Sequence, residues 1–319
     1  MSDHVAYYQG EWMPFSQVHI HPMDRGFIVG DAVFDVARTF NGKSFRMREH
    51  IDRLYRSLKY IRLDPGRTAE ELEQISEEII VRNEHLRADR GDFAIWQCVT
   101  RGVGRWAHQA GPPVVLVYIR SLGFYRYFHL YDEGAHGVIA RHRSYSPDVL
   151  DPKVKNFSRM NFNMAELEAA DVDPTAWPIL LDGRGNVTEG TGYNVFIVAD
   201  GVIKTAGDRS VLQGVSRATV LDLARELRIP LLEEEIQPYD LYNADEVFFA
   251  STSPCVLPVT RVDRRAIGIG KPGPVVQRLL RAWSDTVGVD IVEQARHFGA
   301  KELALLEGRP PADRLAGTA

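Results

Sequence analysis

The 319-residue sequence has few cysteines, little net charge and no long apolar run, and each shortage excludes a class of protein. Two cysteines, Cys98 and Cys255, cannot build the disulfide framework of a small secreted protein, so a reducing compartment fits best. The 38 basic side chains do not outnumber the 43 acidic ones, which leaves no excess positive charge for a nucleic-acid backbone. No apolar run approaches the ~20 residues of a membrane helix, and the first residues lack the basic and apolar blocks of a signal peptide. We expect a cytoplasmic protein that binds neither nucleic acid nor membrane.

What is present is the composition of an ordinary globular protein. Hydrophobic residues make up 45% and charged residues 25% of the chain. This apolar content is enough to offset the entropy of ordering the chain, so a disordered protein is excluded. The length predicts about two domains.

Residues 1–120 alternate between strand and helix patterns. Asn41-Gly42 is a strong two-residue hairpin signal, and Thr68 with Glu71 has the spacing of a capping box. The predicted elements are strands 32–40, 43–47, 93–100 and 114–119 and helices 50–63 and 68–85. We therefore expect a small N-terminal α+β domain with an antiparallel sheet.

The rest of the chain predicts a linker, a larger domain and a tail. Residues 121–134 are rich in aromatics and glycine without a clean period, and we interpret them as the linker. Residues 135–299 predict the larger domain, whose last helix is 275–287. Its other predicted elements are strands 137–142, 177–181, 186–189, 193–198, 231–236, 246–250 and 256–262 and helices 159–170 and 216–228. Residues 300–319 are small, charged and Pro/Gly-containing, and we expect them to be loosely held.

Several familiar motifs fail in context. Gly268–Gly273 has the letters of a dinucleotide-binding fingerprint, but no βαβ unit follows it, so a surface loop is expected. His19 and His21 lack the further ligands of a metal centre, and we interpret them as strand-edge histidines with no metal. No Gly-x-Ser-x-Gly elbow of a serine hydrolase is present.

Polar residues instead gather where strands and helices end. Lys155 precedes a predicted helix, and Glu189 lies beside glycines that permit close approach of a ligand to the backbone. Gly214–Arg217 opens a helix whose N–H groups could hold an anion, and Ser251–Ser253 ends a strand with three hydroxyl-bearing residues. Taken singly, each is ordinarily a surface residue or a helix cap. Their order and spacing together are more specific.

These segments resemble the fold-type IV aminotransferases, which use pyridoxal 5′-phosphate. The family includes branched-chain and D-amino-acid aminotransferases and (R)-selective amine transaminases, with aminodeoxychorismate lyase as a relative that does not transaminate. The resemblance covers roughly residues 7–283. Its motifs are Lys155–Ala169, Thr188–Phe196, Leu212–Arg217, Tyr242–Glu246, Asp24–Phe27, Gly30–Asp31 and His50–Leu54.

The resemblance implies a fold and a cofactor site. The fold would be α/β (α+β), with the small N-terminal domain and a larger, barrel-like C-terminal α/β domain. Lys155 would form the Schiff base with the cofactor and move the substrate proton, because a desolvated lysine amine is a good nucleophile and base. Glu189 would keep the pyridine nitrogen protonated, which makes the ring an electron sink. The remaining cofactor-binding residues would be Arg53, Gly192, Tyr193, Asn194, Gly214, Val215, Ser216, Ser251 and Thr252.

The substrate pocket departs from the family patterns. Branched-chain enzymes carry a tyrosine five residues after the lysine, where this chain has Met160. D-Amino-acid enzymes hold the substrate carboxylate with a tyrosine, an arginine and a histidine. Phe34 stands at the tyrosine position and Trp106 at the arginine position, Arg105 is one residue displaced, and His108 matches. The expected substrate-binding residues are Phe34, Arg105, Trp106, His108 and Ser253, although Arg105 could equally be an exposed loop cation.

We therefore expect a pyridoxal-phosphate-dependent transaminase that moves an amino group from an (R)-amine or a D-amino acid to a 2-oxo acid. The resemblance also implies a homodimer. The alternatives are a branched-chain L-amino-acid aminotransferase, an aminodeoxychorismate lyase, and a cofactor-binding relic that regulates rather than catalyses.

Overall fold

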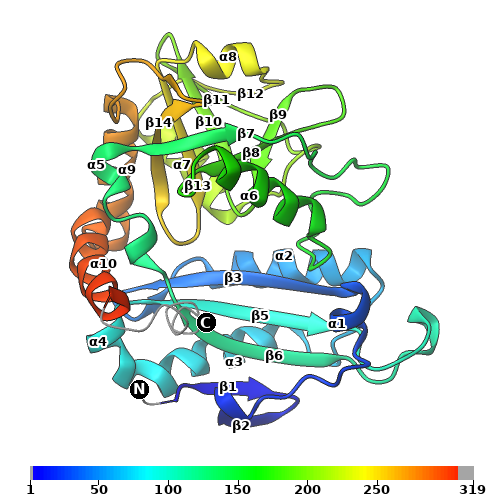
Figure 1. The fold of residues 1–319 in the computed structure, drawn as a ribbon. Helices are drawn as coiled ribbons and strands as arrows, with labels where there is room; N and C mark the ends of the chain where they lie inside the picture. The colour runs from blue at the N-terminus through cyan, green and yellow to red at the C-terminus, as the bar shows by residue number, and fades with distance from the viewer. Residues whose placement is uncertain (1–2, 308–319) are drawn as a thin grey trace. The chain divides into compact units, whose positions relative to one another are not determined.

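The computed structural model describes residues 3–307, which form two compact units (Figure 1). Within the described residues, the N-terminal unit comprises residues 3–122, 154–159 and 305–307. The C-terminal unit comprises residues 123–153 and 160–304. The segment that contains Lys155 thus belongs to the N-terminal unit, although its neighbours in sequence belong to the other.

The N-terminal unit is a six-stranded antiparallel sheet with helices on one face. Its strand order is β2-β1-β6-β5-β3-β4, with β1 Val5–Tyr8, β2 Glu11–Pro14, β3 Ala32–Phe40, β4 Lys43–Ser44, β5 Phe93–Thr100 and β6 Val114–Ser121. The helices are α1 Arg25–Val29, α2 Met47–Tyr60, α3 Ala69–Asn83 and α4 Arg87–Arg90, with short 3-10 turns at Phe15–Gln17, Glu84–Leu86 and Ala107–Gln109.

The core of this unit lies between the sheet and the helices α2 and α3. Ile51, Leu54 and Leu58 of α2 are buried there against alternate residues of the strands, as the 3.6-residue and two-residue periods require. The capping box of α3 is present, since Glu71 N–H donates to Thr68 Oγ1 and Thr68 N–H donates to the Glu71 carboxylate. The predicted small α+β domain is confirmed in its architecture.

The C-terminal unit is built on a nine-stranded mixed sheet. The order β12-β11-β10-β13-β14-β7-β8-β9 is joined by a β9–β10 pairing, so six strands close into a barrel, and β15 pairs with β14. The strands are β7 Ala135–Ile139, β8 Trp177–Leu181, β9 Val187–Gly190, β10 Asn194–Ala199, β11 Val202–Thr205, β12 Leu231–Glu233, β13 Glu246–Ser251, β14 Cys255–Val262 and β15 Arg265–Ala266.

Helices pack around this sheet. The helices are α5 Leu130–Glu133, α6 Met160–Val172, α7 Val215–Glu226, α8 Pro238–Tyr242, α9 Pro274–Val287 and α10 Ile291–Glu307, with a 3-10 turn at Phe124–Arg126. Helix α6 packs on β7 and β8, and α9 packs on β13 and β14. None of the helices within the described residues is long and apolar enough to cross a membrane.

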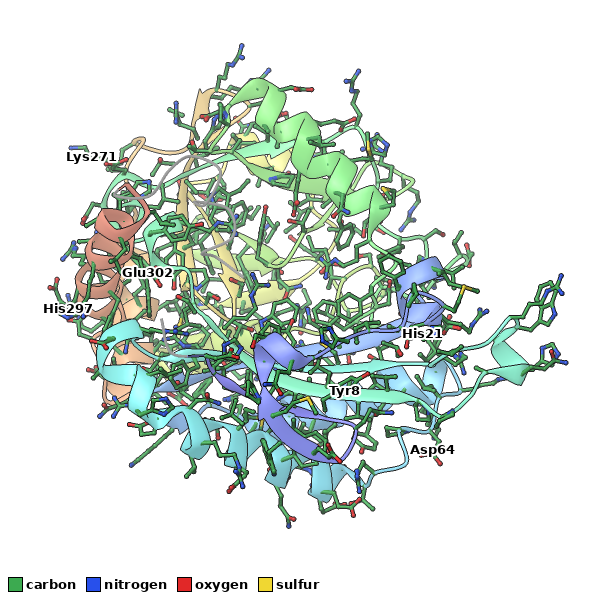
Figure 2. The ribbon with its side chains drawn as sticks, turned by 60° about the horizontal axis from the view of Figure 1, so that its bottom comes forward. Tyr8, His21, Asp64, Lys271, His297 and Glu302 are labelled. Atoms are coloured by element: carbon green, nitrogen blue, oxygen red, sulfur yellow. The ribbon has the colours of Figure 1, made fainter. Side chains whose placement is uncertain are left out.

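Some expectations need correction. The predicted linker carries the 3-10 turn and α5, and α10 continues through residues 300–307 of the predicted loose tail. Residues 308–319 of that tail lie outside the described residues. His19 and His21 lie in an exposed loop rather than on a strand, where the Met23 N–H donates to His21 Nδ1 at 3.0 Å (Figure 2). The predicted loop at Gly268–Gly273 is confirmed, and Lys271 of this loop is exposed.

Candidate active site

Lys155 lies on a short segment that runs antiparallel to β3. The Phe34 N–H donates to the Lys155 carbonyl at 3.0 Å, and a bridge pairs Val33 with Asn156. From the other side, the Lys155 N–H donates to Ser57 Oγ of α2 at 3.2 Å. The main chain of the lysine is therefore held by both a strand and a helix of the same unit.

An aromatic surface lies beside the Lys155 amine. The Lys155 Nζ lies 4.6 Å from the centre of the Phe34 ring. The Phe34 ring stacks on the Trp96 ring, with 5.3 Å between the ring centres and an interplanar angle of 6°. Trp96 in turn stacks on Tyr118 at 6.0 Å. The sequence analysis missed Trp96 and Tyr118, although two-residue alternation on paired strands could have placed them on one face of the sheet.

A buried charged network lies on the helix side of β3. Asp35 accepts hydrogen bonds from Arg53 Nε at 2.8 Å and from one Arg53 Nη at 2.7 Å, and His50 Nδ1 lies 2.7 Å from its carboxylate. Burial raises the pKa of Asp35, but the Arg53 charge and the His50 hydrogen bond hold it well below its usual range. Burial lowers the pKa of His50 against the opposing effect of Asp35. His50 is therefore neutral at pH 7 and donates from Nδ1.

The network includes Arg53, which the sequence predicts to bind the cofactor phosphate. Arg53 contributes two of its donors to Asp35, so the arginine is oriented as well as charged. Asp35 and His50 were not predicted. An acidic residue on the buried face of a strand, and His and Arg three residues apart on a helix, were the available signals.

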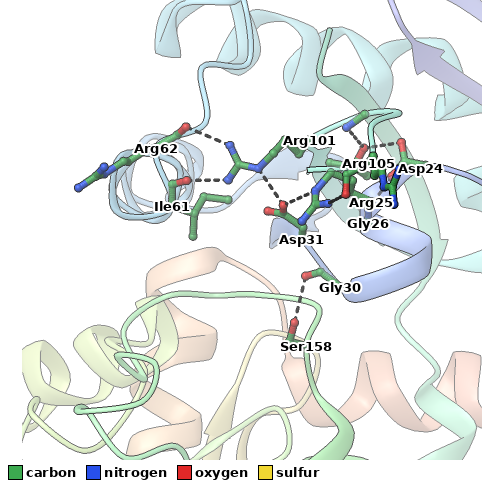
Figure 3. Close-up of polar contacts among 12 residues, drawn as sticks. Asp24, Arg25, Gly26, Gly30, Asp31, Ile61, Arg62, Arg101, Arg105 and Ser158 are labelled. Carbon is green, nitrogen blue, oxygen red and sulfur yellow. Dashed lines mark hydrogen bonds and ion pairs between the residues drawn. The ribbon is translucent and has the colours of Figure 1, made fainter. Parts of the chain in front are cut away.

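The loop between β5 and β6 holds three predicted substrate-binding residues. Arg105, Trp106 and His108 are all exposed, and the Arg105 guanidinium lies 5.7 Å from the Trp106 ring centre. Figure 3 shows how this loop is anchored. Asp31 accepts hydrogen bonds from Arg25 Nε at 2.9 Å and Arg101 Nε at 2.8 Å, and Arg25 also donates to the Arg105 carbonyl.

In the C-terminal unit, Glu189 and Asn194 face each other across the β9–β10 pairing. Glu189 is 5% exposed, and its carboxylate accepts the Leu212 N–H at 3.1 Å. The Asn194 side-chain amide donates to the Leu212 carbonyl at 3.0 Å. Both predicted residues therefore hold the segment that leads into α7.

Helix α7 begins beside this pair. Its N-cap is Gly214, which provides no side-chain capping bond, and the first N–H groups of a helix have no partner within the helix. A Cβ on Gly214 would lie 2.2 Å from Asn194 Oδ1, so a larger residue would displace the Asn194 side chain from this place. The predicted residues Val215 and Ser216 form the first turn, where an anion is stabilised by the helix dipole.

The other predicted residues of this unit lie at strand ends. Ser251 ends β13, and Thr252 and Ser253 form the turn to β14. Gly192 lies in the turn between β9 and β10. Tyr193 is buried, donates its hydroxyl hydrogen bond to the Pro178 carbonyl at 2.7 Å, and packs its ring on Phe249. The Tyr193 side chain thus has a structural use, while its main chain remains beside the glycines.

The chain is similar to known proteins over most of its length. Residues 32–262 match the family "Amino-transferase class IV". The chain belongs to this family. A putative branched-chain-amino-acid aminotransferase of Methanocaldococcus jannaschii is 34% identical over 285 residues, which are 88% of this chain and 95% of the relative. A D-alanine aminotransferase of Staphylococcus aureus strain N315 is 31% identical over 276 residues, 85% of this chain and 93% of the relative.

Solved structures are similar over the same length. A branched-chain amino acid aminotransferase of T.th., complexed with N-(5′-phosphopyridoxyl)-L-glutamate, superposes with a TM-score of 0.81 and 26% identity, covering 90% of this chain and 95% of that one. The same enzyme with pyridoxamine 5′-phosphate gives a TM-score of 0.82 and 26% identity, covering 94% and 98%. The predicted two-domain fold-type IV architecture is confirmed.

The family assignment establishes the class of reaction. The protein is a pyridoxal-phosphate-dependent transaminase that acts on amino acid and keto acid substrates. The residues present fit this cofactor, since they offer a lysine amine, a buried carboxylate for a protonated ring nitrogen, and an uncapped helix N-terminus for a phosphate.

Proposed function

We propose that the amino donor is an (R)-amine or a D-amino acid and that a 2-oxo acid accepts the amino group. The observation that carries this proposal is the aromatic surface of Phe34 and Trp96 beside the Lys155 amine. Such a surface suits an apolar group of the donor. Arg159 and Arg120, whose guanidinium groups lie 5.7 Å from the Phe34 ring centre and 5.4 Å from the Trp96 ring centre, are the charges that a donor carboxylate would meet there. The similarity to D-alanine aminotransferases supports the same stereochemical side.

In this proposal each residue has a defined task. Pyridoxal phosphate, when bound, supplies the ring that accepts the electron pair left on the donor carbon. Lys155 binds the cofactor through its amine and moves the donor proton, and Glu189 holds the proton on the ring nitrogen. Arg53, Val215, Ser216 and Thr252 bind the phosphate. The remaining proposed cofactor contacts are Gly192, Tyr193, Asn194, Gly214 and Ser251.

The proposed substrate-binding residues lie in the N-terminal unit, except for Ser253, which lies in the turn between β13 and β14. Phe34 and Trp106 would contact the apolar part of the donor, and Arg105 would pair with the carboxylate of the 2-oxo acid. His108 and Ser253 are the remaining proposed substrate contacts. The exposed position of Arg105 on an anchored loop leaves its guanidinium accessible to a ligand.

A half-reaction screen tests the donor. The purified holoenzyme is mixed with (R)-1-phenylethylamine, (S)-1-phenylethylamine, D-Ala or L-Leu, and loss of the absorbance of the lysine-bound cofactor is followed. Reaction with the (R)-amine or with D-Ala, and none with the (S)-amine, is expected. Borohydride should fix the cofactor to the wild-type protein but not to Lys155→Ala. Lys153→Ala is the control, because Lys153 pairs with Asp151, and borohydride should still fix the cofactor to this variant.

A branched-chain L-amino-acid donor is the second candidate. The 34% identical relative from Methanocaldococcus jannaschii favours it. The position of Met160 speaks against it, because methionine cannot donate the hydrogen bond that a tyrosine would provide there. Reaction with L-Leu alone would select this candidate and overturn the first.

We further propose that the protein is a homodimer. Phe27 of α1 is 74% exposed and Val29 is 55% exposed, and Met23, Val103 and Trp106 add exposed apolar surface from neighbouring segments of the same unit. Exposed apolar side chains gathered in this way are typical of a protein interface. A second copy of the chain is the partner that the family resemblance implies.

A further inference from the structure

We propose that Ser57 is a positioning residue that fixes the main chain of Lys155. Ser57 lies on the buried face of α2, one turn after Arg53, and only 1% of its surface is exposed. Its Oγ donates to the Arg53 carbonyl at 3.2 Å and accepts the Lys155 N–H at 3.2 Å. The inference rests on the proposed role of Lys155.

A single hydroxyl can make both of these bonds through one atom. A serine Oγ has one donor hydrogen and two acceptor lone pairs, so it can bond a carbonyl and an N–H at the same time. The bond to Arg53 fixes the direction of the hydroxyl hydrogen, which turns the lone pairs toward the Lys155 N–H. A side chain without an acceptor would leave this N–H without its helix-side partner.

The lysine is thereby held on both sides of its Cα. The Lys155 carbonyl accepts the Phe34 N–H from β3, and the Lys155 N–H is held by α2. With both peptide groups fixed, the place of the amine depends on side-chain rotation alone. This matters because a lysine has a long flexible stem, and a displacement of about 1 Å can cost about a hundredfold in rate.

Ser57 belongs to a row of buried polar residues on one face of α2. His50, Arg53 and Ser57 lie at intervals of three and four residues and are all buried. Burial and the Arg53 charge lower the pKa of His50, and the positive charge of Lys155 adds to this lowering, so the amine lies within electrostatic reach of this face. Helix α2 thus provides both the charge environment of Lys155 and, through Ser57, its attachment.

Ser57→Ala tests the proposal, with Ser76→Ala as the matched control. Ser76 on α3 is 0% exposed, donates to the Leu72 carbonyl four residues back, and accepts from Gln97 Nε2 at 3.2 Å. Each variant therefore removes a buried serine hydroxyl that donates to a main-chain carbonyl of its own helix and accepts a hydrogen bond from another segment. Ser57→Cys is a second variant, which keeps the size of the side chain but has a weak acceptor.

Three measurements are made on the full chain. The first is hydrogen–deuterium exchange of the peptide that contains Lys155, recorded with and without cofactor. The second is the pH at which the absorbance of the lysine-bound cofactor changes. The third is the separate determination of kcat and KM for the complete transamination. We expect both Ser57 variants to exchange faster at Lys155, to shift the pH midpoint, and to lose about tenfold or more in kcat, with Ser76→Ala unchanged in all three.

The outcomes separate this proposal from the proposed function. Wild-type exchange at Lys155 in both Ser57 variants would overturn the positioning role, whatever the activity. Equal changes in Ser57→Ala and Ser76→Ala would also overturn it, because the effect would then be a general loss of stability. Failure of borohydride to fix the cofactor at Lys155 in wild type would overturn the proposed function, whereas the exchange comparison would still decide whether Ser57 holds the Lys155 N–H.

Discussion

At the scale of single residues, two buried carboxylates serve different purposes. Asp35 is matched by Arg53 and His50 and so holds charged partners in place. Glu189 accepts the Leu212 N–H and is the residue proposed to hold the proton on the ring nitrogen of the cofactor. In this proposed role, the Glu189 carboxylate should matter more for reaction rate than for stability.

Glu189→Gln should leave the protein folded, because the amide oxygen can still accept the Leu212 N–H. The variant should bind cofactor but abstract the donor proton several orders of magnitude more slowly, since a neutral amide no longer keeps the ring nitrogen protonated. Stopped-flow absorbance in the half-reaction measures this rate.

Glu246→Gln is the matched control for Glu189→Gln. Glu246 is also buried and accepts two main-chain N–H groups, from Val275 and Val276, both at 2.9 Å. We expect this variant to lose stability but to keep its rate. A wild-type rate in Glu189→Gln would contradict the role assigned to Glu189.

At the scale of elements, α2 combines an apolar face with a buried polar one. Ile51, Leu54 and Leu58 attach the helix to the sheet, while His50 and Arg53 face Asp35 of β3. Removing one partner of such a buried pair typically costs about 3–5 kcal/mol, because the other charge is left uncompensated. The polar face is therefore sensitive to protonation.

The stability of the protein should fall as the pH falls below about 6.5. The pKa of His50 is lowered by burial in the folded state, so the unfolded chain binds more protons in this range and is favoured by acid. The depressed pKa of Asp35 adds a further loss below about pH 4, with the same sign. One such group changes the free energy of unfolding by at most about 1.4 kcal/mol per pH unit.

Urea unfolding at pH 7, 6 and 5 measures this dependence. His50→Gln keeps a donor for Asp35 but cannot titrate, so its free energy of unfolding should change less across this range than that of wild type. Parallel curves for the two proteins would show that His50 does not contribute.

The loop between β5 and β6 is a second element whose residues divide into two tasks. Arg101 donates to Asp31 and to the carbonyls of Ile61 and Arg62, and this gives it a structural task (Figure 3). Arg105 is attached through its carbonyl, so its guanidinium remains available for a substrate carboxylate.

Arg105→Ala should weaken the half-reaction with the 2-oxo acid and spare transfer from a carboxylate-free amine. A charge-assisted hydrogen bond contributes about 1.5–3 kcal/mol, or roughly ten- to a hundredfold, only to a substrate that carries the carboxylate. The two half-reactions are compared in separate single-turnover measurements.

Arg101→Ala is the control for Arg105→Ala and should impair both half-reactions, because it loosens the whole loop. An equal loss in both half-reactions for Arg105→Ala would assign Arg105 to loop support. No loss in either would make it a solvated surface cation.

At the scale of the whole molecule, each of the two units contains residues proposed to bind the cofactor. Lys155 and Arg53 belong to the N-terminal unit, and Glu189 and the start of α7 belong to the C-terminal unit. Exposed apolar residues of α1 provide the surface proposed for a second copy.

Phe27→Asp should shift the protein from dimer to monomer at micromolar concentration, because a charge at the centre of an apolar interface is desolvated on association. Size-exclusion chromatography with light scattering measures the mass. Val81→Asp on α3 is the control, since Val81 is exposed to a similar extent, 70%, outside this surface. A dimeric Phe27→Asp would move the interface elsewhere.

The sequence alone predicted the elements with strong periodicity and the residues in contiguous motifs. Strands β3, β5 and β8 have the predicted bounds, and the capping box at Thr68 is present, because alternation and capping are local properties. The family motifs likewise lie in short segments, so Lys155 and Glu189 could be named before any fold was known. Helix α10 was missed because its segment was interpreted from its charged and small residues.

Only the tertiary structure decided which residues surround these motifs. Ser57 and Lys155 are 98 residues apart, and Asp35 and Arg53 lie on different elements, so no local pattern relates them. Strand pairing brings the Trp96 and Tyr118 rings beside the Phe34 ring. The segment that contains Lys155 likewise pairs with β3, which is far from it in the sequence. Periodicity determines which way a side chain faces within its own element. The partner it meets there depends on long-range register, which folding alone sets.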